Sequence, residues 1–381
     1  MFDQSKRLWR LALAMALTTG VGSAAADPGV TDKEIAIGHS ITLQGGKNAY
    51  GTAAHDGMKL YIDAVNATGG VHGRQLTLRT LDDQNNNATA EANARQLVQD
   101  GVFVLFGAVE GGPSTAVAKV ATETKVPFFG PMAGPPGLRR PHQPMVFPVR
   151  AEHRDEFRAL MEWGHATGLK TVGFLHADSP RGLEHVKNVD IIAKELGMTV
   201  VQTLPMTDKA TDEDIEKAAR AIAEIKPDLF FNHGSANLYQ RLLKRAKATG
   251  VKTAFMGVNS GSSQIAAALG PLAQGMVFAQ VVPSPWQRKH EISREYQAAV
   301  RQAGGKLALS YGGLEGFMTA KALVMALRAT GRDLTRASFV RTLQTTPFDL
   351  GGVRARYDAG DHQGSHFVDL SMVTRDGQFI H

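Results

Sequence analysis

Short apolar runs alternate with longer segments of helical periodicity along almost the whole chain after residue 30. Residues 34–38 alternate apolar and polar side chains as a strand does, and residues 52–66 then carry apolar side chains at helical spacing. Residues 103–106 are continuously apolar, which is typical of a strand covered on both faces. Strands separated by helices of this length form parallel sheets with helices on both faces. The sequence therefore predicts an α/β protein.

The alternation runs through four strands and then begins again near residue 152, which predicts two doubly wound lobes. Proline clusters at 141–148 and 283–285 mark the breaks between them, and the turn-rich tail from residue 348 to 381 predicts short strands. Asn87 is predicted to cap the second helix. The remaining predicted strands are 75–81, 127–129, 171–176, 199–204, 229–232 and 253–256. The remaining predicted helices are 87–99, 114–124, 152–167, 182–195, 212–225, 237–249, 287–303 and 311–330.

The N-terminus has the three parts of a secretory signal peptide. Lys6, Arg7 and Arg10 form a positive region, residues 11–17 are apolar, and residues 24–26 are alanines suited to cleavage before residue 27. The alternative is a membrane anchor, but the apolar stretch is short for one. We therefore expect residues 1–26 to be a signal peptide and the protein to be exported to the periplasm.

Composition and motifs argue against several classes of function. The chain has no cysteine, which excludes disulfides, thiolate metal sites and a cysteine nucleophile. The net charge is +6, without a basic stripe, so nucleic-acid binding is not expected. Phosphate-binding and nucleophile-elbow motifs are absent, and Arg294 stands where a zinc motif beginning at His290 would need its second histidine. We expect no enzyme activity, no cofactor and no metal.

In open α/β sheets, ligands bind beyond the carboxyl ends of the strands. Six loops leave such ends here, three in each lobe, and several are rich in glycine and serine. Two lobes whose strand ends face one another form a cleft that can close on a ligand. The six loops are 40–51, 107–113, 130–136, 177–182, 233–236 and 257–261.

Residues 66–76, NATGGVHGRQL, resemble the N-x-x-G-G-[I/V]-x-G-[R/K]-x-[I/L] segment of the solute-binding proteins of branched-chain amino acid ABC transporters. Similar residues occur at 82–83, 103–107, 126–127, 251–257 and 311–327, so the resemblance covers residues 31–375. It implies a type I periplasmic binding fold, that is, two doubly wound parallel-sheet lobes joined by three crossover segments. The first lobe would then comprise residues 27–147 and 283–347, and the second residues 148–282 and 348–381.

The resemblance also implies where a ligand would bind. Family members that bind amino acids hold the carboxylate with hydroxyl groups, at positions that correspond to Gly111 and Gly134, and the ammonium with an acid, at the position of Asn259. Tyr50 matches an aromatic position, whereas Arg181 replaces one and suits a carboxylate.

Three further candidates lie in the same loops, and each candidate has an alternative interpretation. Gly112, Met132 and Ser235 complete the predicted set. Arg181 could instead point to solvent, Tyr50 could pack between the lobes, and the glycines could serve only turns. An acid elsewhere, such as Glu110, could balance an ammonium.

We therefore expect a monomeric periplasmic receptor that binds an amino acid or related small carboxylate and delivers it to the permease and ATPase of an ABC importer. Because Gly111, Gly134 and Asn259 depart from the family pattern, an aromatic or aliphatic carboxylate or an amide is an alternative ligand. A sensor of the same fold that is not coupled to transport, and a hydrolase acting in the cleft, are alternative functions.

Overall fold

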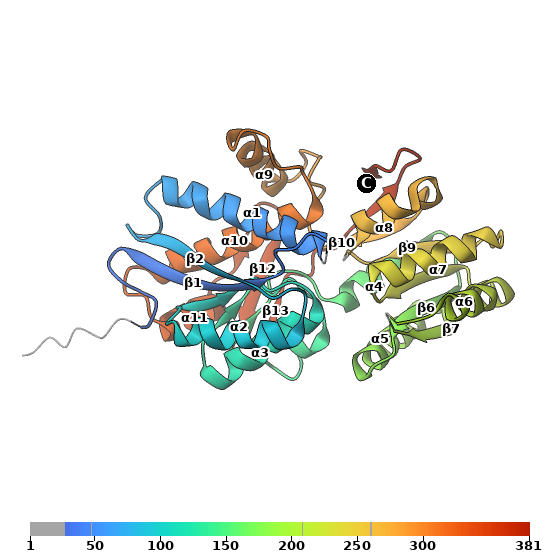
Figure 1. The fold of residues 1–381 in the computed structure, drawn as a ribbon, viewed down its shortest axis with the longest axis horizontal. Helices are drawn as coiled ribbons and strands as arrows, with labels where there is room; N and C mark the ends of the chain where they lie inside the picture. Colours follow the sequence, from blue (N-terminus) through green and yellow to red (C-terminus); the bar gives the residue numbers. More distant parts are fainter. Residues whose placement is uncertain (1–26, 47, 208, 260) are drawn as a thin grey trace, which may run out of the picture.

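The computed structural model describes residues 27–46, 48–207, 209–259 and 261–381, and it consists of two α/β lobes side by side (Figure 1). The predicted signal peptide, residues 1–26, lies outside the described residues. Among the described helices, none is both long and apolar enough to cross a membrane. The α/β fold class with two parallel-sheet lobes is confirmed.

The first lobe is built on a parallel sheet with the strand order β2-β1-β3-β4-β5. Helices α1 and α10 pack on one face of the sheet, and α2 and α3 on the other. The strands are β1 (Glu34–Ile41), β2 (Gln75–Asp82), β3 (Val104–Phe106), β4 (Phe128–Phe129) and β5 (Val146–Phe147). The helices are α1 (Ala49–Ala67), α2 (Asn87–Gln99), α3 (Gly111–Thr124), α9 (Glu291–Gln302), α10 (Tyr311–Thr330) and α11 (Arg336–Thr345).

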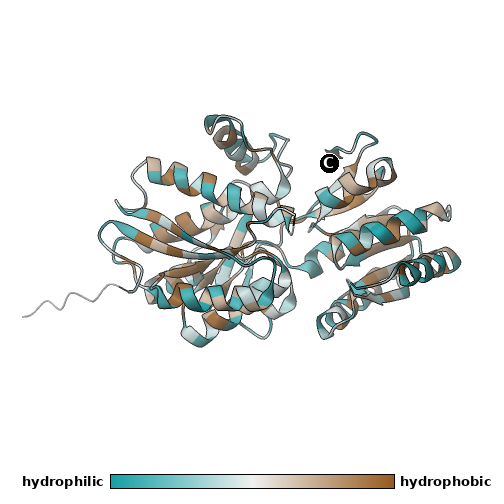
Figure 2. Ribbon diagram, viewed as in Figure 1, coloured by the Kyte–Doolittle hydropathy of each residue, from teal (hydrophilic) through white to brown (hydrophobic). Residues whose placement is uncertain are grey.

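The second lobe repeats this plan with the order β7-β6-β8-β9-β10 and adds two antiparallel strands, β14 beside β10 and β15 beside β14. Helices α4 and α5 cover one face, and α6, α7 and α8 the other; Figure 2 shows hydrophobic and hydrophilic residues alternating along α7. The strands are β6 (Thr171–Ala177), β7 (Thr199–Met206), β8 (Leu229–His233), β9 (Ala254–Gly257), β10 (Val277–Gln280), β14 (Asp369–Val373) and β15 (Phe379–Ile380). The helices are α4 (His153–Ala166), α5 (Pro180–Leu196), α6 (Asp212–Ile225), α7 (Ala236–Ala248) and α8 (Ser262–Leu269).

A third, three-stranded sheet corrects the predicted position of the last crossover. It comprises β11 (Phe348–Asp349), β12 (Arg354–Asp358) and β13 (Asp361–Gly364). The strands of this sheet pack against the first lobe, and Phe348 and Tyr357 are buried in the hydrophobic cluster that also contains residues of α1 and α10. The chain therefore returns to the second lobe between β13 and β14, and not at residue 347. The division of the chain into two lobes otherwise remains our interpretation.

Local sequence explains where the helices begin. Asn48, Ser179 and Thr211 accept hydrogen bonds from backbone N–H groups at the starts of α1, α5 and α6. Asn86, and not the predicted Asn87, caps α2. Structural elements that the prediction omitted are β5, β10, α8 and α11.

Glycines allow α1 and α10 to pack with their backbones in contact. A Cβ atom on Gly57 of α1 would lie 1.9 Å from the carbonyl oxygen of Gly313 in α10, and one on Gly316 would lie 2.0 Å from that of Ala54. The close packing holds the first turn of α1, which contains Tyr50, at the edge of the first lobe that faces the second.

Candidate functional site

A cleft of about 590 Å³ lies between the two lobes. Besides residues from the loops after β4 and β9, its walls include the loops that follow β1 and β3 in the first lobe and β6 and β8 in the second. In each sheet these two strands are neighbours whose helices lie on opposite faces, so the cleft is where ligands bind doubly wound folds.

The first-lobe wall presents the N-terminus of α3. Gly111 and Gly112 open this helix and line the cleft, and the preceding residue, Glu110, has a φ of 69° and makes no side-chain capping hydrogen bond. The first N–H groups of a helix lack partners within the helix and carry partial positive charge. Because glycine has no side chain, a ligand can approach these N–H groups closely.

The second-lobe wall presents Arg181 from the first turn of α5. Its guanidinium reaches across to the first lobe, since a Cβ atom on Gly111 would lie 3.1 Å from Arg181 Nη1. An arginine and the N-terminus of a helix therefore approach the same space from opposite lobes. Both favour an anion, and a carboxylate between them would contact both lobes.

Three histidines form the inner part of the second-lobe wall. His153 begins α4, His185 lies on α5 and His233 ends β8. The ring centroid of His233 is 4.1 Å from that of His153 and 4.0 Å from that of His185. We call these three residues the imidazole cluster. Burial lowers the pKa of each, and the neighbouring cations lower it further, so the cluster is neutral at pH 7.

Behind the cleft, buried polar side chains join the lobes. The Tyr50 hydroxyl donates a hydrogen bond to the Glu315 carboxylate and accepts one from Asn259 Nδ2 at 2.7 Å. Asn259 Nδ2 also lies 3.2 Å from Glu315 Oε2. Burial raises the pKa of Tyr50 well above its ordinary value, so the phenol keeps its proton.

Arg150, in the first crossover, provides the positive charge of this region. Its Nη2 lies 2.6 Å from Glu156 Oε1, and its Nη1 lies 3.7 Å from Glu315 Oε1. Burial alone would lower the pKa of Arg150, but the two carboxylates outweigh burial and raise it. Arg150 therefore stays charged and links α4 of the second lobe to α10 of the first.

The structure brings six of the eight predicted ligand contacts to the cleft. These six are Tyr50, Gly111, Gly112, Met132, Arg181 and Ser235. Ser235 also caps α7, because its Oγ accepts a hydrogen bond from Leu238 N at 3.1 Å. Whether any of them contacts a ligand remains a prediction.

Gly134 and Asn259 lie elsewhere. A Cβ atom on Gly134 would lie 2.7 Å from His153 N, so this glycine packs against the start of α4. Asn259 is fully buried, and its backbone N–H donates to Glu156 Oε2 at 2.7 Å. The position expected to contact a ligand ammonium therefore serves the contact between the lobes.

The imidazole cluster and the two buried glutamates, Glu156 and Glu315, were not predicted from the sequence. Two signals were available for the histidines. His185 follows Arg181 by four residues, which places both side chains on one face of a helix. His233 opens a loop at the carboxyl end of a predicted strand. Neither Glu156 nor Glu315 stands out within its helical segment.

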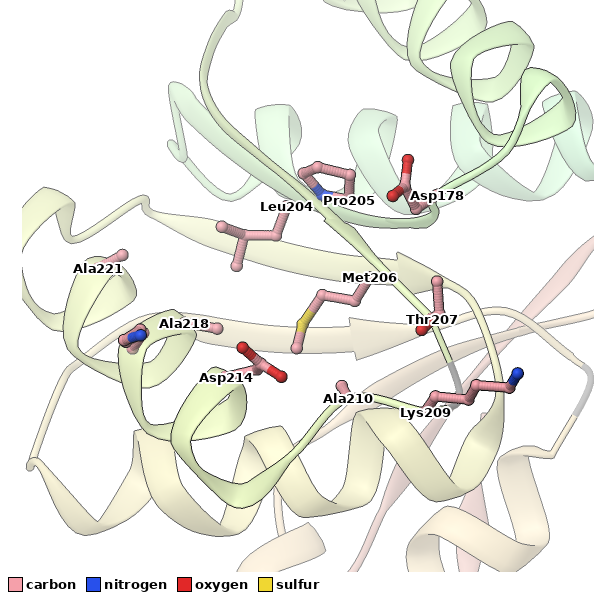
Figure 3. A pocket seen from close by; sticks show the side chains of 11 residues that line it. Asp178, Leu204, Pro205, Met206, Thr207, Lys209, Ala210, Asp214, Ala218 and Ala221 are labelled. Atoms are coloured by element: carbon pink, nitrogen blue, oxygen red, sulfur yellow. The ribbon is translucent and has the colours of Figure 1, made fainter.

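The second lobe has another hollow, of about 480 Å³, between the end of β7 and α6. Figure 3 shows Asp178 and Pro205 on one side of it, Asp214 and Ala218 on the other, and the Met206 side chain between them. Its lining comes from the second lobe alone, so a molecule bound there would not contact both lobes.

Within the described ranges, no group of three or more histidine, aspartate or glutamate side chains is arranged to hold a metal ion. The imidazole cluster is not such a group, and its rings meet at interplanar angles of 61° for His153 and His233 and 49° for His185 and His233.

Comparisons with known proteins place this geometry in a family. Residues 34–378 match the family described as periplasmic binding protein. The chain is 25% identical over 393 residues to the Leu/Ile/Val-binding protein homolog 8 of Brucella suis, covering 98% of this chain and 96% of that protein. It is 30% identical over 126 residues to the Leu/Ile/Val-binding protein homolog 3 of Brucella melitensis, a match that spans a third of each chain.

Solved structures share the fold at lower identity. A branched-chain amino acid ABC transporter protein from Thermus thermophilus with bound valine has a TM-score of 0.79 at 18% identity, covering 92% of this chain and 96% of its own. A solute-binding protein of R. palustris in complex with benzoate has a TM-score of 0.76 at 20% identity, covering 91% and 95%. With a family match over nearly all of the described residues and a cleft between two lobes of this fold, the chain belongs to the periplasmic binding protein family, as the resemblance in its sequence indicated.

Proposed function

We propose that this protein is the periplasmic receptor of an ABC importer and that it binds a small carboxylate in the cleft between its lobes. The convergence of Arg181 and the N-terminus of α3 on one space, from opposite lobes, carries this proposal. Valine and benzoate, named for two proteins of the same fold, differ in every group except the carboxylate.

The carboxylate explains how binding would be coupled to closure. Arg181 belongs to one lobe, and the N–H groups of Gly111 and Gly112 belong to the other, so an anion that contacts both stabilises the closed arrangement. The membrane permease then receives the closed form, and the partner ATPase supplies the energy for transport. The chain acts by binding and not by catalysis.

The cleft offers few partners for the ammonium group of an amino acid. Asn259 already forms hydrogen bonds with Tyr50, Glu315 and Glu156. Among the described residues that line the cleft, Glu110 is the one acidic side chain. We therefore place the main affinity in the carboxylate, with amino acids included as ligands through that group.

The test compares leucine with two fragments of it, 4-methylpentanoate and 3-methylbutylamine, by thermal shift and calorimetry on the purified protein. A ligand at about 100 times its Kd should stabilise the protein by roughly 2.7 kcal/mol. We expect the acid to bind and the amine not to bind. Arg181→Ala should weaken binding of the acid by roughly tenfold or more, since a charge-assisted hydrogen bond contributes about 1.5–3 kcal/mol.

Arg354→Ala is the matched control, because Arg354 lies on β12, is exposed and is not among the residues that line the cleft. It should leave binding unchanged. Binding of the amine but not the acid, or equal binding by wild type and Arg181→Ala, would contradict the proposal.

A further inference from the structure

His185 is a buried side chain that lines the cleft without a hydrogen-bond partner. Its side chain is fully buried, and within the described part of the chain neither ring nitrogen has a partner. Buried polar groups are nearly always hydrogen-bonded, and leaving one unpaired costs about 1–3 kcal/mol. A group that enters the cleft and bonds to His185 would recover this loss.

The neighbouring His153 is fixed in one tautomer. Its Nδ1 lies 3.0 Å from Glu156 Oε1, and the same carboxylate accepts hydrogen bonds from Arg150 Nη2 and from the backbone N–H of Asn259. Because the carboxylate accepts, Nδ1 carries the proton. In the neutral ring Nε2 is therefore an acceptor, and a group bound there has to donate.

The surroundings of the imidazole cluster oppose a positive charge on it. Burial is the largest cause of the lowered pKa of each histidine, and the other histidines and nearby arginines add to it. Among the described residues, Glu156 is the one carboxylate in hydrogen-bond contact with the cluster, and it is already paired with Arg150. The charged groups that lower these pKa values are Arg139, Arg150 and Arg181, with His176 acting on His185.

We propose that the imidazole cluster binds a hydroxyl group of the ligand, so that the cleft takes a hydroxylated carboxylic acid. A neutral imidazole offers one donor and one acceptor, and a hydroxyl is the small group that both donates and accepts. A second carboxylate only accepts, so it could not donate to the acceptor nitrogen of His153, and its charge would favour uptake of a proton by the cluster. This inference rests on the proposed function, since it assigns the carboxylate to Arg181.

The placement of the two groups follows from helix geometry. Arg181 and His185 are four residues apart on α5, and both line the cleft. A ligand whose carboxylate lies at Arg181 therefore extends along α5 toward the imidazoles. We therefore expect the hydroxyl group on a carbon remote from the carboxyl group, and not on the carbon that bears the carboxyl group.

The experiment measures Kd by calorimetry for pairs of acids that differ by one remote hydroxyl. The probes are benzoate and 4-hydroxybenzoate, 3-phenylpropionate and its 4-hydroxyphenyl analogue, and hexanoate and 6-hydroxyhexanoate, with succinate as a diacid. We expect the hydroxylated member of at least one pair to bind roughly tenfold or more tightly than its partner, because it satisfies His185.

Variants of His185 separate recognition from folding. His185→Phe keeps a flat ring without hydrogen-bonding nitrogens, and it should remove the preference for the hydroxyl while the weaker binding of the plain acid persists. His185→Gln keeps a donor and an acceptor and should retain part of the preference. His142→Phe is the control, because the His142 ring makes an edge-to-face contact with His362 and is absent from the cleft lining. Without ligand, His185→Phe should melt at or above the wild-type temperature, because it removes two unpaired nitrogens.

Each outcome decides between the two proposals. Equal affinities within every pair, a preference that survives in His185→Phe, or binding of succinate with uptake of a proton would overturn the hydroxyl assignment and leave the carboxylate receptor intact. If no acid binds in an Arg181-dependent manner, the proposed function fails, and the present inference fails with it.

Discussion

The phenol of Tyr50, in the first lobe, accepts a hydrogen bond of 2.7 Å from the side-chain amide of Asn259, in the second. Both side chains are buried, and both also bond to Glu315. The lobes are therefore joined behind the cleft by a specific polar contact as well as by the three crossovers. This contact lies between the two lobes in the arrangement that the structure shows.

Tyr50→Phe should lower the free energy of unfolding by about 1–3 kcal/mol, because it leaves a buried carboxylate and a buried amide with one partner fewer. Tyr357→Phe is the matched control, since the buried Tyr357 hydroxyl has no partner among the described residues. The control should be neutral or stabilising. Urea unfolding at pH 7 measures both, and equal losses in the two variants would contradict a special role for Tyr50.

Acid should destabilise the protein before its carboxylates titrate. Burial, with the nearby His55, lowers the pKa of His39 to about 3, whereas an unfolded histidine titrates near its ordinary value of 6.5. Between these values the unfolded chain binds a proton that the folded chain does not bind, so stability is lost as the pH falls below 6.5. At pH 5.5 each such histidine lowers the free energy of unfolding by about 1.4 kcal/mol.

The measurement for His39 is urea unfolding at pH 7.5 and at pH 5.5. His39→Gln should lose about 1.4 kcal/mol less than wild type between these two values. The matched control is His366→Gln, because the His366 side chain is exposed. A pH dependence in His39→Gln that equals that of wild type would refute this account.

Gly57→Ala should destabilise the first lobe by about 1–3 kcal/mol, since the added methyl group would overlap the backbone of α10 and force the two helices apart. Gly137→Ala adds the same methyl group in open space, because nothing lies within 4 Å of that position, and it should be neutral. Thermal melting compares them. If Gly57→Ala has the same melting temperature as Gly137→Ala, the close packing of α1 and α10 does not limit stability.

The sequence predicts most of the fold because its strongest signals are local. The predicted bounds of α6 and α10 are those of the structure, since Thr211 caps the first and Ser310 the second and each helix has a long regular pattern. Helix α8 is short and built from small residues, and β5 has two residues, so neither carries a period that can be recognised.

The candidate site is predictable where it follows from position at a strand end and not where it depends on distant partners. Arg181 and the glycines that begin α3 lie just beyond the carboxyl ends of strands, where the fold rule places ligands. Asn259 lies beyond such a strand end too, but its side chain turns to Tyr50 and Glu315, which are far away in the sequence. The spacing of residues along the sequence does not indicate which partners the Asn259 side chain contacts.

The packing of α1 on α10 also determines the order in which this protein can be assembled. Residues 49–67 bury their apolar face against residues 311–330, and β12 then completes the same core. A chain made from its N-terminus therefore holds the first lobe incomplete until nearly all of it has been synthesised, whereas most strands of the second lobe are contiguous. Contacts between such distant segments slow folding. We therefore expect the first lobe to fold more slowly than the second.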